Sequence, residues 1–310
     1  MPQGACGRIK RGAVPNTLVH FAVQGPASRG LSRHLDPRWI YLGCLLPDVP
    51  WILRRAVVAL GLPVDPIDLR LYTMAQASLA GTLLLCAALA AATVAPRLVL
   101  SVLGLNALLH LLLDATEVKW GNGVHLFAPF SWRMTSFDFV AGESALMLAL
   151  TIAGALLLAL EIARPRAPVV GLDLRPRRLA AAAALLAAYL VAPLPFFGAL
   201  EGSDSYGVKT LREVAGRAGR AVSFDRTAFQ VTPAGGLVHL WNGERVRATG
   251  AIPDHDARVS LRGTFLASDV LRVDQLLEHR HDRDWPTYVA LGLLALVWAR
   301  PLWPPRRPPP

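Results

Sequence analysis

Apolar and polar positions divide the chain into two regions. Residues 1–200 carry long apolar runs, whereas residues 201–285 carry short runs separated by Gly, Pro, Asn and Asp. A helix that crosses a bilayer needs ~20 predominantly apolar residues. Runs near that length predict helices over residues 75–94, 98–116, 140–162 and 179–200, with a shorter one over 288–302. A sixth candidate, over 39–62, is interrupted by Asp48 and by Arg54 and Arg55.

The second region has the pattern of a small β-domain. Its short runs are β-branched or aromatic, and "WNGE" places Asn242-Gly243 between two of them, a strong hairpin signal. Four or five strands favour an OB-like barrel over a small sandwich. The predicted fold class is an α-helical membrane protein, with five to six apolar helices and an all-β domain inserted before the last one. The expected domains are a helical membrane domain (1–200), an extracytoplasmic β-domain (201–285), and a last helix with a Pro/Arg tail (286–310).

Composition and charge support a membrane location. The 310-residue chain is 53% hydrophobic and 17% charged, with a mean hydropathy of +0.39, which suits a membrane protein with a soluble module. The net charge is +10, but residues 201–285 hold twelve acidic and twelve basic side chains. The excess lies in the amino-terminal stretch, the linker 164–178 and the tail, as the positive-inside rule describes. We expect a multi-pass inner-membrane protein with the linker in the cytoplasm and the β-domain outside, and no nucleic-acid partner.

Three polar residues interrupt the apolar run over 98–116. Asn106, His110 and Asp114 follow one another at four-residue spacing, so they share one face of a helix. An ionisable group inside a membrane is costly and is normally satisfied by a partner, an ion or a water-filled cavity. An imidazole and a carboxylate one turn apart also form a compact pair of metal ligands. This face predicts either a metal site or a hydrogen-bonded contact between helices.

Further motifs in the amino-terminal half extend this pattern. "NTLVHFAVQG" carries His20, "GCLLPDVPW" carries Asp48, and "ALLHLLLDAT" leads into "GNGVHLFAPFSWR" with His125. In order and spacing, these motifs resemble a family of bacterial inner-membrane proteins described as metal-dependent hydrolases and related distantly to zinc-dependent phospholipases C. The resemblance covers roughly residues 15–135. It implies as metal ligands His20, Asp48, His110 and Asp114, with His125 as an additional candidate.

The chain departs from the family pattern at three positions. Pro50 stands where the family carries a second acidic residue, two after the LLPD aspartate. Tyr72 and Ala77, in "YTMAQASLAG", replace the two histidines of an H-R-x-x-T-H-S motif. These replacements leave open a second interpretation, in which the chain is a catalytically degenerate membrane scaffold whose β-domain binds a protein partner.

Each candidate ligand also has an interpretation that involves no metal. Asp48 follows Pro47 and could cap a helix. His20 could be a packed histidine on an apolar stretch. His125 could lie in an interfacial loop beside Trp120 and Trp132.

A bound metal would define the chemistry. Two histidines and two aspartates suit zinc or another divalent first-row ion. Such an ion lowers the pKa of a bound water and polarises a phosphoryl or carbonyl oxygen. The sequence therefore predicts a membrane-bound, metal-dependent hydrolase that lies among membrane lipids and acts on a lipid-like or other phosphoester substrate.

Overall fold

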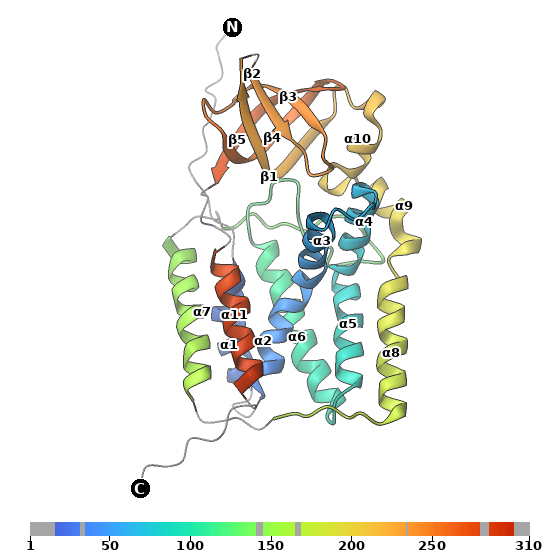
Figure 1. The fold of residues 1–310 in the computed structure, drawn as a ribbon, viewed down its shortest axis with the longest axis vertical. Coiled ribbons are helices and arrows are strands. Elements are labelled where there is room, and N and C mark those ends of the chain that lie inside the picture. Colours follow the sequence, from blue (N-terminus) through green and yellow to red (C-terminus); the bar gives the residue numbers. More distant parts are fainter. Residues whose placement is uncertain are drawn as a thin grey trace.

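The apolar segments form a bundle of helices, and a β-barrel stands on one end of it (Figure 1). The computed structural model describes residues 16–31, 35–140, 145–164, 169–233, 235–279 and 285–300. The bundle consists of α1 (Thr17–Leu31), α2 (Pro37–Leu45), α5 (Leu79–Ala91), α6 (Pro96–Ala115), α7 (Ala145–Ala163), α8 (Pro176–Val191) and α11 (Trp285–Ala299). Shorter helices at the end facing the barrel are α3 (Val49–Ala59), α4 (Pro66–Gln76), α9 (Phe197–Gly202) and α10 (Val208–Arg212).

Three helical segments in the described residues are long and apolar enough to cross a membrane, namely Pro96–Ala115, Ala145–Ala163 and Pro176–Gly202. The pair α4 and α5 would add a fourth if counted as one span, although it is bent by 68° at its junction. Helix α11 is apolar but shorter, and the end of the predicted last span, together with the tail, lies outside the described residues. The described residues thus contain three or four helical segments of that length and composition, fewer than the five to six predicted.

The predicted helix over 39–62 is wrong as a single element. A 3₁₀ turn, Leu46–Asp48, separates α2 from α3. Pro47 and Pro50 explain the break, because a proline has no backbone N–H and is tolerated only where a helix begins. Asp48 is consequently placed at a junction between two short helices instead of inside a long one.

The second region forms a closed five-stranded barrel before the last helix, as the strand pattern predicts. The strands follow one another in the order β1-β2-β3-β5-β4, with β3 parallel to β5 and the other neighbours antiparallel. Gly243, at a φ of +91°, turns the chain between β2 and β3 at the predicted hairpin. The strands are β1 (Ala221–Thr232), β2 (Gly235–His239), β3 (Arg245–Gly250), β4 (Ala257–Ala267) and β5 (Val270–His279).

The barrel shares a hydrophobic core with the helices beneath it. Leu71 and Met74 of α4, together with Leu211 of α10, belong to the same cluster as the barrel residues Phe224 and Leu261. The predicted β-domain starts at residue 201, but its first strand begins only at Ala221. The residues in between form short helices and turns. The junction between helices and barrel is therefore a packed interface.

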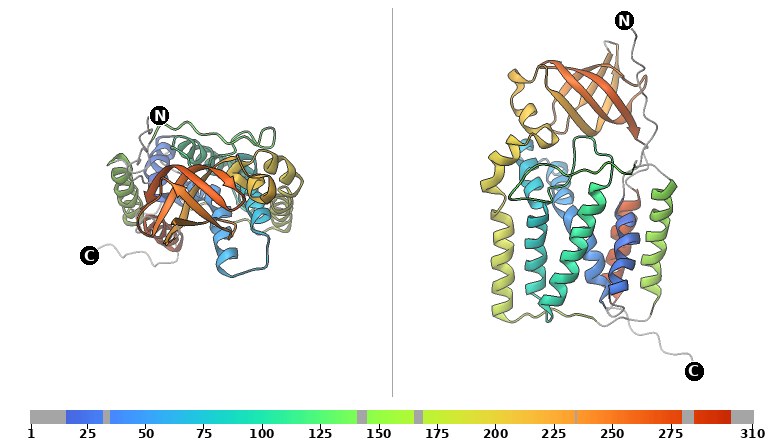
Figure 2. Two further views of the ribbon diagram at one scale, coloured as in Figure 1. Left: turned by 90° about the horizontal axis from the view of Figure 1, so that it is seen from above. Right: turned by 180° about the vertical axis from the view of Figure 1, so that it is seen from behind.

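Close packing of α1, α2 and α6 prepares the site. Along the bundle, α8 packs on α5, α5 on α6, α6 on α2, α2 on α1, and α1 on α7 (Figure 2). A Cβ atom at Gly43 would lie 2.9 Å from the Cβ of Asn106 and 3.1 Å from the Cα of Leu103. Only glycine allows α2 to approach α6 so closely.

Candidate functional site

Four predicted ligands meet where α1, the α2–α3 junction and α6 come together. Asp114 lies between two imidazoles, with its Oδ1 3.4 Å from His20 Nε2 and its Oδ2 3.5 Å from His110 Nε2. On the other side, His110 Nε2 lies 3.6 Å from Asp48 Oδ1. The rings of His20 and His110 stack with centroids 3.8 Å apart and planes 8° apart. These four residues are called the His/Asp cluster below.

The cluster is buried on its imidazole side and open on its carboxylate side. The side chains of His20 and His110 are 3% and 1% exposed, whereas those of Asp114 and Asp48 are 24% and 35% exposed. Asp48 stands immediately before α3 but makes no capping hydrogen bond with its side chain. Its carboxylate thus faces the cluster without serving the helix as a cap.

Second-layer contacts fix both imidazoles. His110 Nδ1 lies 2.6 Å from the backbone oxygen of Cys44, so this nitrogen donates, and Nε2 is the nitrogen that faces the two carboxylates. The amide of Gln24 satisfies its neighbours when its oxygen accepts from His20 Nδ1 at 3.2 Å and its nitrogen donates to the backbone oxygen of Asn106 at 2.9 Å. Metal-binding histidines are commonly oriented in this way.

The spacing of the cluster suits a shared ion better than direct hydrogen bonds. Nitrogen-to-oxygen hydrogen bonds are about 2.7–3.2 Å long. The three distances between imidazole nitrogens and carboxylate oxygens in the cluster are longer, at 3.4, 3.5 and 3.6 Å. Four tetrahedral ligands ~2.0–2.2 Å from one zinc ion are separated from one another by roughly 3.3–3.6 Å. One ligand atom from each of His20, His110 and Asp114 lies within 4.8 Å of the others. These three side chains therefore fit a divalent first-row ion, whereas Asp48 lies outside this group and contacts it through His110.

Asn106, the third polar residue of the α6 face, lies behind the cluster and links helices. Its amide donates to Ser28 Oγ at 2.9 Å and to the backbone oxygen of Val102 at 2.8 Å. For this residue, the interpretation as a polar contact between helices is the correct one.

His125 lies apart from the cluster, which corrects its place among the candidate ligands. Its ring packs edge-on against Trp132, with centroids 5.9 Å apart. Neither ring nitrogen makes a hydrogen bond of normal geometry among the described residues, and the nearby backbone of Trp132 opposes the effect of burial on the pKa only in part. Burial lowers the pKa of His125 to about 4, so the ring is neutral at neutral pH. The loop after α6 directs the His125 side chain toward apolar and aromatic neighbours.

A cavity of about 580 Å³ extends from the cluster to the underside of the barrel. His20, Asp48 and Asp114 line its inner end. The rest of its wall is rich in aromatic and cationic side chains from three parts of the chain, including Trp51, Arg54, Arg70, Lys119, Tyr206 and Trp241. The sequence gives no reason to connect these residues; the only local signal is an arginine in the mostly apolar segment "IDLRLYTM".

Lys119 keeps a positive charge at this cavity. Its Nζ lies 2.7 Å from Glu117 Oε2. Burial alone would lower the pKa of Lys119, but the carboxylates of Asp114 and Glu117 raise it above its usual value. The cavity therefore carries a permanent cation just beyond the cluster.

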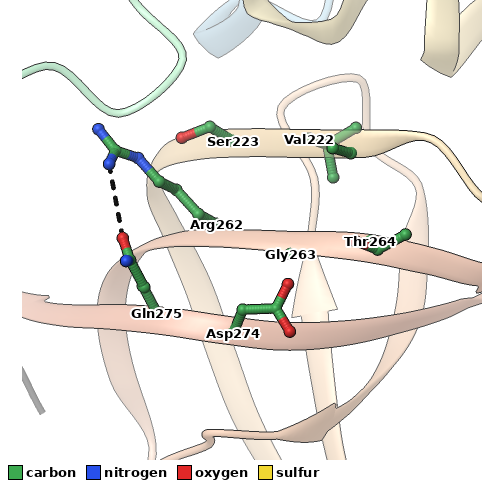
Figure 3. A pocket seen from close by; sticks show the side chains of 8 residues that line it. Val222, Ser223, Arg262, Gly263, Thr264, Asp274 and Gln275 are labelled. Carbon is green, nitrogen blue, oxygen red and sulfur yellow. Dashed lines mark hydrogen bonds between the residues drawn. The ribbon is translucent and has the colours of Figure 1, made fainter. Parts of the chain in front are cut away.

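A groove on the outside of the barrel is a weaker candidate (Figure 3). It measures about 490 Å³ and is lined by Ser223, Arg262, Thr264, Asp274 and Gln275, among others. These five side chains are partly or fully exposed. Arg262 donates to Gln275 Oε1 at 3.5 Å within the groove (Figure 3) and to the backbone oxygen of Lys119 at 2.8 Å, which ties the barrel to the loop below. The groove contains no group of metal ligands and no buried reactive side chain.

A Ser/His/Asp contact inside the barrel is structural. Ser260 Oγ donates to Asp225 Oδ1 at 2.6 Å and lies 2.7 Å from His279 Nε2. Ser260 is fully buried, so a substrate has no access to it. Because its hydroxyl donates to the carboxylate, the imidazole is not positioned to remove that proton.

Comparisons with protein-family models, with curated proteins and with solved structures each found no match to this chain. The functional argument therefore depends on the geometry of the His/Asp cluster and its cavity.

Proposed function

We propose that this protein is a membrane-bound hydrolase that uses a divalent metal ion, zinc being the best fit, to hydrolyse phosphoesters. The observation that carries the proposal is the group of His20, His110 and Asp114, whose ligand atoms lie within 4.8 Å of one another. Asp48 adds a second carboxylate 3.6 Å from His110 Nε2, and the cluster lies beside a cavity. These residues come from distant positions in the sequence, and buried polar groups need partners, which a shared ion would supply to all of them.

The exposed surface of the bundle supports a membrane location. Helix α7 exposes Leu146, Leu148, Ile152, Leu156 and Leu160. Large contiguous apolar surfaces are rare on soluble monomers. Lipid would cover this surface at no cost, because acyl chains are as apolar as leucine.

The charge distribution supports an orientation with the barrel outside. At the end of the bundle away from the barrel, α1 ends near Arg29, α7 ends before Arg164, α8 begins with Arg177 and Arg178, and α11 ends before Arg300 (Figure 1). By the positive-inside rule this end is cytoplasmic. The barrel, the cavity and the His/Asp cluster then lie at the outer face of a bacterial inner membrane.

Within the cluster, each residue would have a distinct role in binding the ion. A bound divalent ion would supply an activated water and would polarise a phosphoryl oxygen. His20 and His110 would bind through Nε2, because Gln24 and Cys44 hold their Nδ1 atoms. Asp114 offers one oxygen toward each imidazole. Asp48, the most exposed of the four, faces the cavity from which substrate would enter.

Substitution of His110 by alanine tests the proposal. Wild-type protein purified in detergent under metal-replete conditions should hold about one ion per chain by elemental analysis. His110→Ala should lose that ion and any phosphoesterase activity, because the substitution removes a ligand and its geometry together. His239→Ala, which changes a strand residue of the barrel, is the matched control and should keep both. A wild type without bound metal would rule the proposal out.

The scaffold interpretation remains the second candidate, because the two family histidines are missing. The Tyr72 hydroxyl donates to the backbone oxygen of Leu190 on α8 at 2.7 Å, and neither Tyr72 nor Ala77 lines the cavity. These positions therefore supply no further ligands to the cluster. Under this interpretation the wild type binds no metal, and His110→Ala changes only helix packing.

A further inference from the structure

The cavity beside the His/Asp cluster holds a buried arginine that forms no ion pair with a described side chain, although the carboxylate of Asp225, in the same cavity, favours its charge. Arg70, on α4, is only 9% exposed, and its Nε atom has no hydrogen-bond partner among the described residues. Its guanidinium lies 4.0 Å from the ring centroid of Trp241, 5.0 Å from that of Tyr206 and 5.8 Å from that of Trp51. Arg70 forms none of the ion pairs found between described side chains.

The aromatic rings contact the faces of the guanidinium and leave the N–H donors at its edge available. Aromatic rings stabilise a cation through its face, whereas the N–H donors of arginine lie in the guanidinium plane. A buried charge without a counter-ion is unfavourable unless something completes it. Because Arg70 lines the cavity, an anion inside the cavity would reach the free N–H donors of this guanidinium.

A second guanidinium shares the same aromatic wall. Arg54, on α3, lies 6.0 Å from the ring centroid of Trp241, and its Nε is also without a hydrogen-bond partner among the described residues. Arg54 is close enough to Arg70 to disfavour the charge of Arg70. One anion between them would relieve this repulsion and satisfy donors of both side chains. Two guanidiniums match a dianion, and a phosphate accepts such paired, planar donors.

We propose that Arg54 and Arg70 bind the phosphate group of an organic phosphate in this cavity, under a roof that Trp241 of the barrel and Tyr206 provide. The site would hold either a lipid phosphate or a soluble phosphate ester. The anion site does not depend on a bound metal. Only the identification of its ligand as the substrate rests on the proposed function. The barrel then has a defined role, because without Trp241 the aromatic wall is incomplete.

Calorimetry with inorganic phosphate tests the anion site on the full-length chain in a phosphate-free detergent. The wild type should bind phosphate. Arg70→Gln and Arg54→Gln should each weaken binding by roughly 10- to 100-fold, the range for losing a charged hydrogen-bonding partner. Arg97→Gln, which changes an exposed arginine in the first turn of α6, should bind like the wild type. Arg54→Gln gives a second test if Arg70→Gln does not fold.

Metal analysis of the same samples separates this proposal from the proposed function. Arg70→Gln should keep any metal that the wild type holds, whereas His110→Ala should keep phosphate binding within a few-fold. Phosphate binding that disappears in His110→Ala but persists in Arg70→Gln would place the anion on a metal and overturn the proposal. A wild type with arginine-dependent phosphate binding and no metal would support the anion site while ruling out the hydrolase.

Competition identifies the source of the phosphate. Glycerol 3-phosphate and vesicles of phosphatidic acid in phosphatidylcholine are each compared for displacement of inorganic phosphate. Stronger displacement by phosphatidic acid indicates a lipid ligand, and equal or stronger displacement by glycerol 3-phosphate indicates a soluble ester; either result supports the site. Equal displacement by acetate would overturn it, since a single negative charge does not match two guanidiniums.

Discussion

At the scale of single residues, the environment of an imidazole decides what it can do. His110 has one nitrogen held by the backbone oxygen of Cys44 and the other near two carboxylates. His125 has an equally buried ring, but its neighbours are apolar and aromatic. The first environment suits an electron-pair donor to an ion, and the second suits a neutral packing group.

His125 should make the stability of the protein depend on pH. Burial lowers its pKa from 6.5 to about 4, so between these values the unfolded chain binds a proton that the folded chain refuses. Stability is therefore complete above pH 6.5 and falls as pH drops toward 4. At pH 5 the loss is about 2 kcal/mol.

Thermal unfolding of the wild type and of His125→Leu, compared at pH 7.5 and at pH 5, measures this effect. Leucine fits the apolar surroundings and does not titrate. The Tm of the wild type should fall more than that of the variant over this range. Parallel pH profiles would contradict the assignment of His125 as a buried neutral ring.

At the scale of elements, the site depends on how closely two helices approach and on where one helix stops. The turn Leu46–Asp48 ends α2 beside α6 and turns Asp48 toward His110. Gly43, just before this turn, lets the backbone of α2 lie against α6. The contact between Cys44 and His110 depends on that approach.

Gly43→Ala should disturb both stability and the cluster. The added Cβ would meet Asn106 and Leu103 at 2.9 and 3.1 Å, so α2 must move away from α6. We expect a loss of about 1–3 kcal/mol, typical of an overpacked core, and weaker metal binding because His110 loses its second-layer acceptor. Thermal unfolding and metal titration measure the two effects.

Gly292→Ala is the control for this experiment. Apart from its chain neighbours and the backbone of its own helix, no atom of the described residues lies within 4 Å of a Cβ built at Gly292, and alanine favours a helix over glycine by roughly 1 kcal/mol. This substitution in α11 should be neutral or stabilising. If Gly43→Ala behaves in the same way, close helix packing does not maintain the site.

At the scale of the whole molecule, the barrel closes the cavity in which the cluster lies. Its core is continuous with that of α4 and α10, and Trp241 donates through Nε1 to the backbone oxygen of Tyr206 at 3.1 Å. The orientation proposed for the molecule places this whole assembly outside the cytoplasm.

Thiol labelling tests that orientation. In a Cys6→Ser background the remaining cysteines, Cys44 and Cys86, are buried. Ser268→Cys adds an exposed thiol on the barrel, and Leu174→Cys adds one before α8. A membrane-impermeant reagent should label Ser268→Cys in intact spheroplasts and Leu174→Cys only after lysis. The opposite result would place the barrel in the cytoplasm.

The sequence by itself determined the features that depend on neighbouring positions. Four-residue spacing placed His110 and Asp114 on one helical face, and the Asn242-Gly243 dipeptide marked the hairpin of the barrel. Apolar runs located the membrane-length helical segments Pro96–Ala115, Ala145–Ala163 and Pro176–Gly202. Each of these follows from the fixed periodicity of a helix or a strand, which local sequence encodes.

Only the tertiary structure decided which distant residues meet. The separation of His125 from the cluster, the meeting of His20 and Asp48 with α6, and the aromatic wall around Arg70 all depend on packing between segments far apart in the chain. The break at Leu46–Asp48 and the glycine contact at Gly43 set these distances. No local periodicity encodes them, because they arise from shape complementarity between surfaces that exist only after the helices have formed.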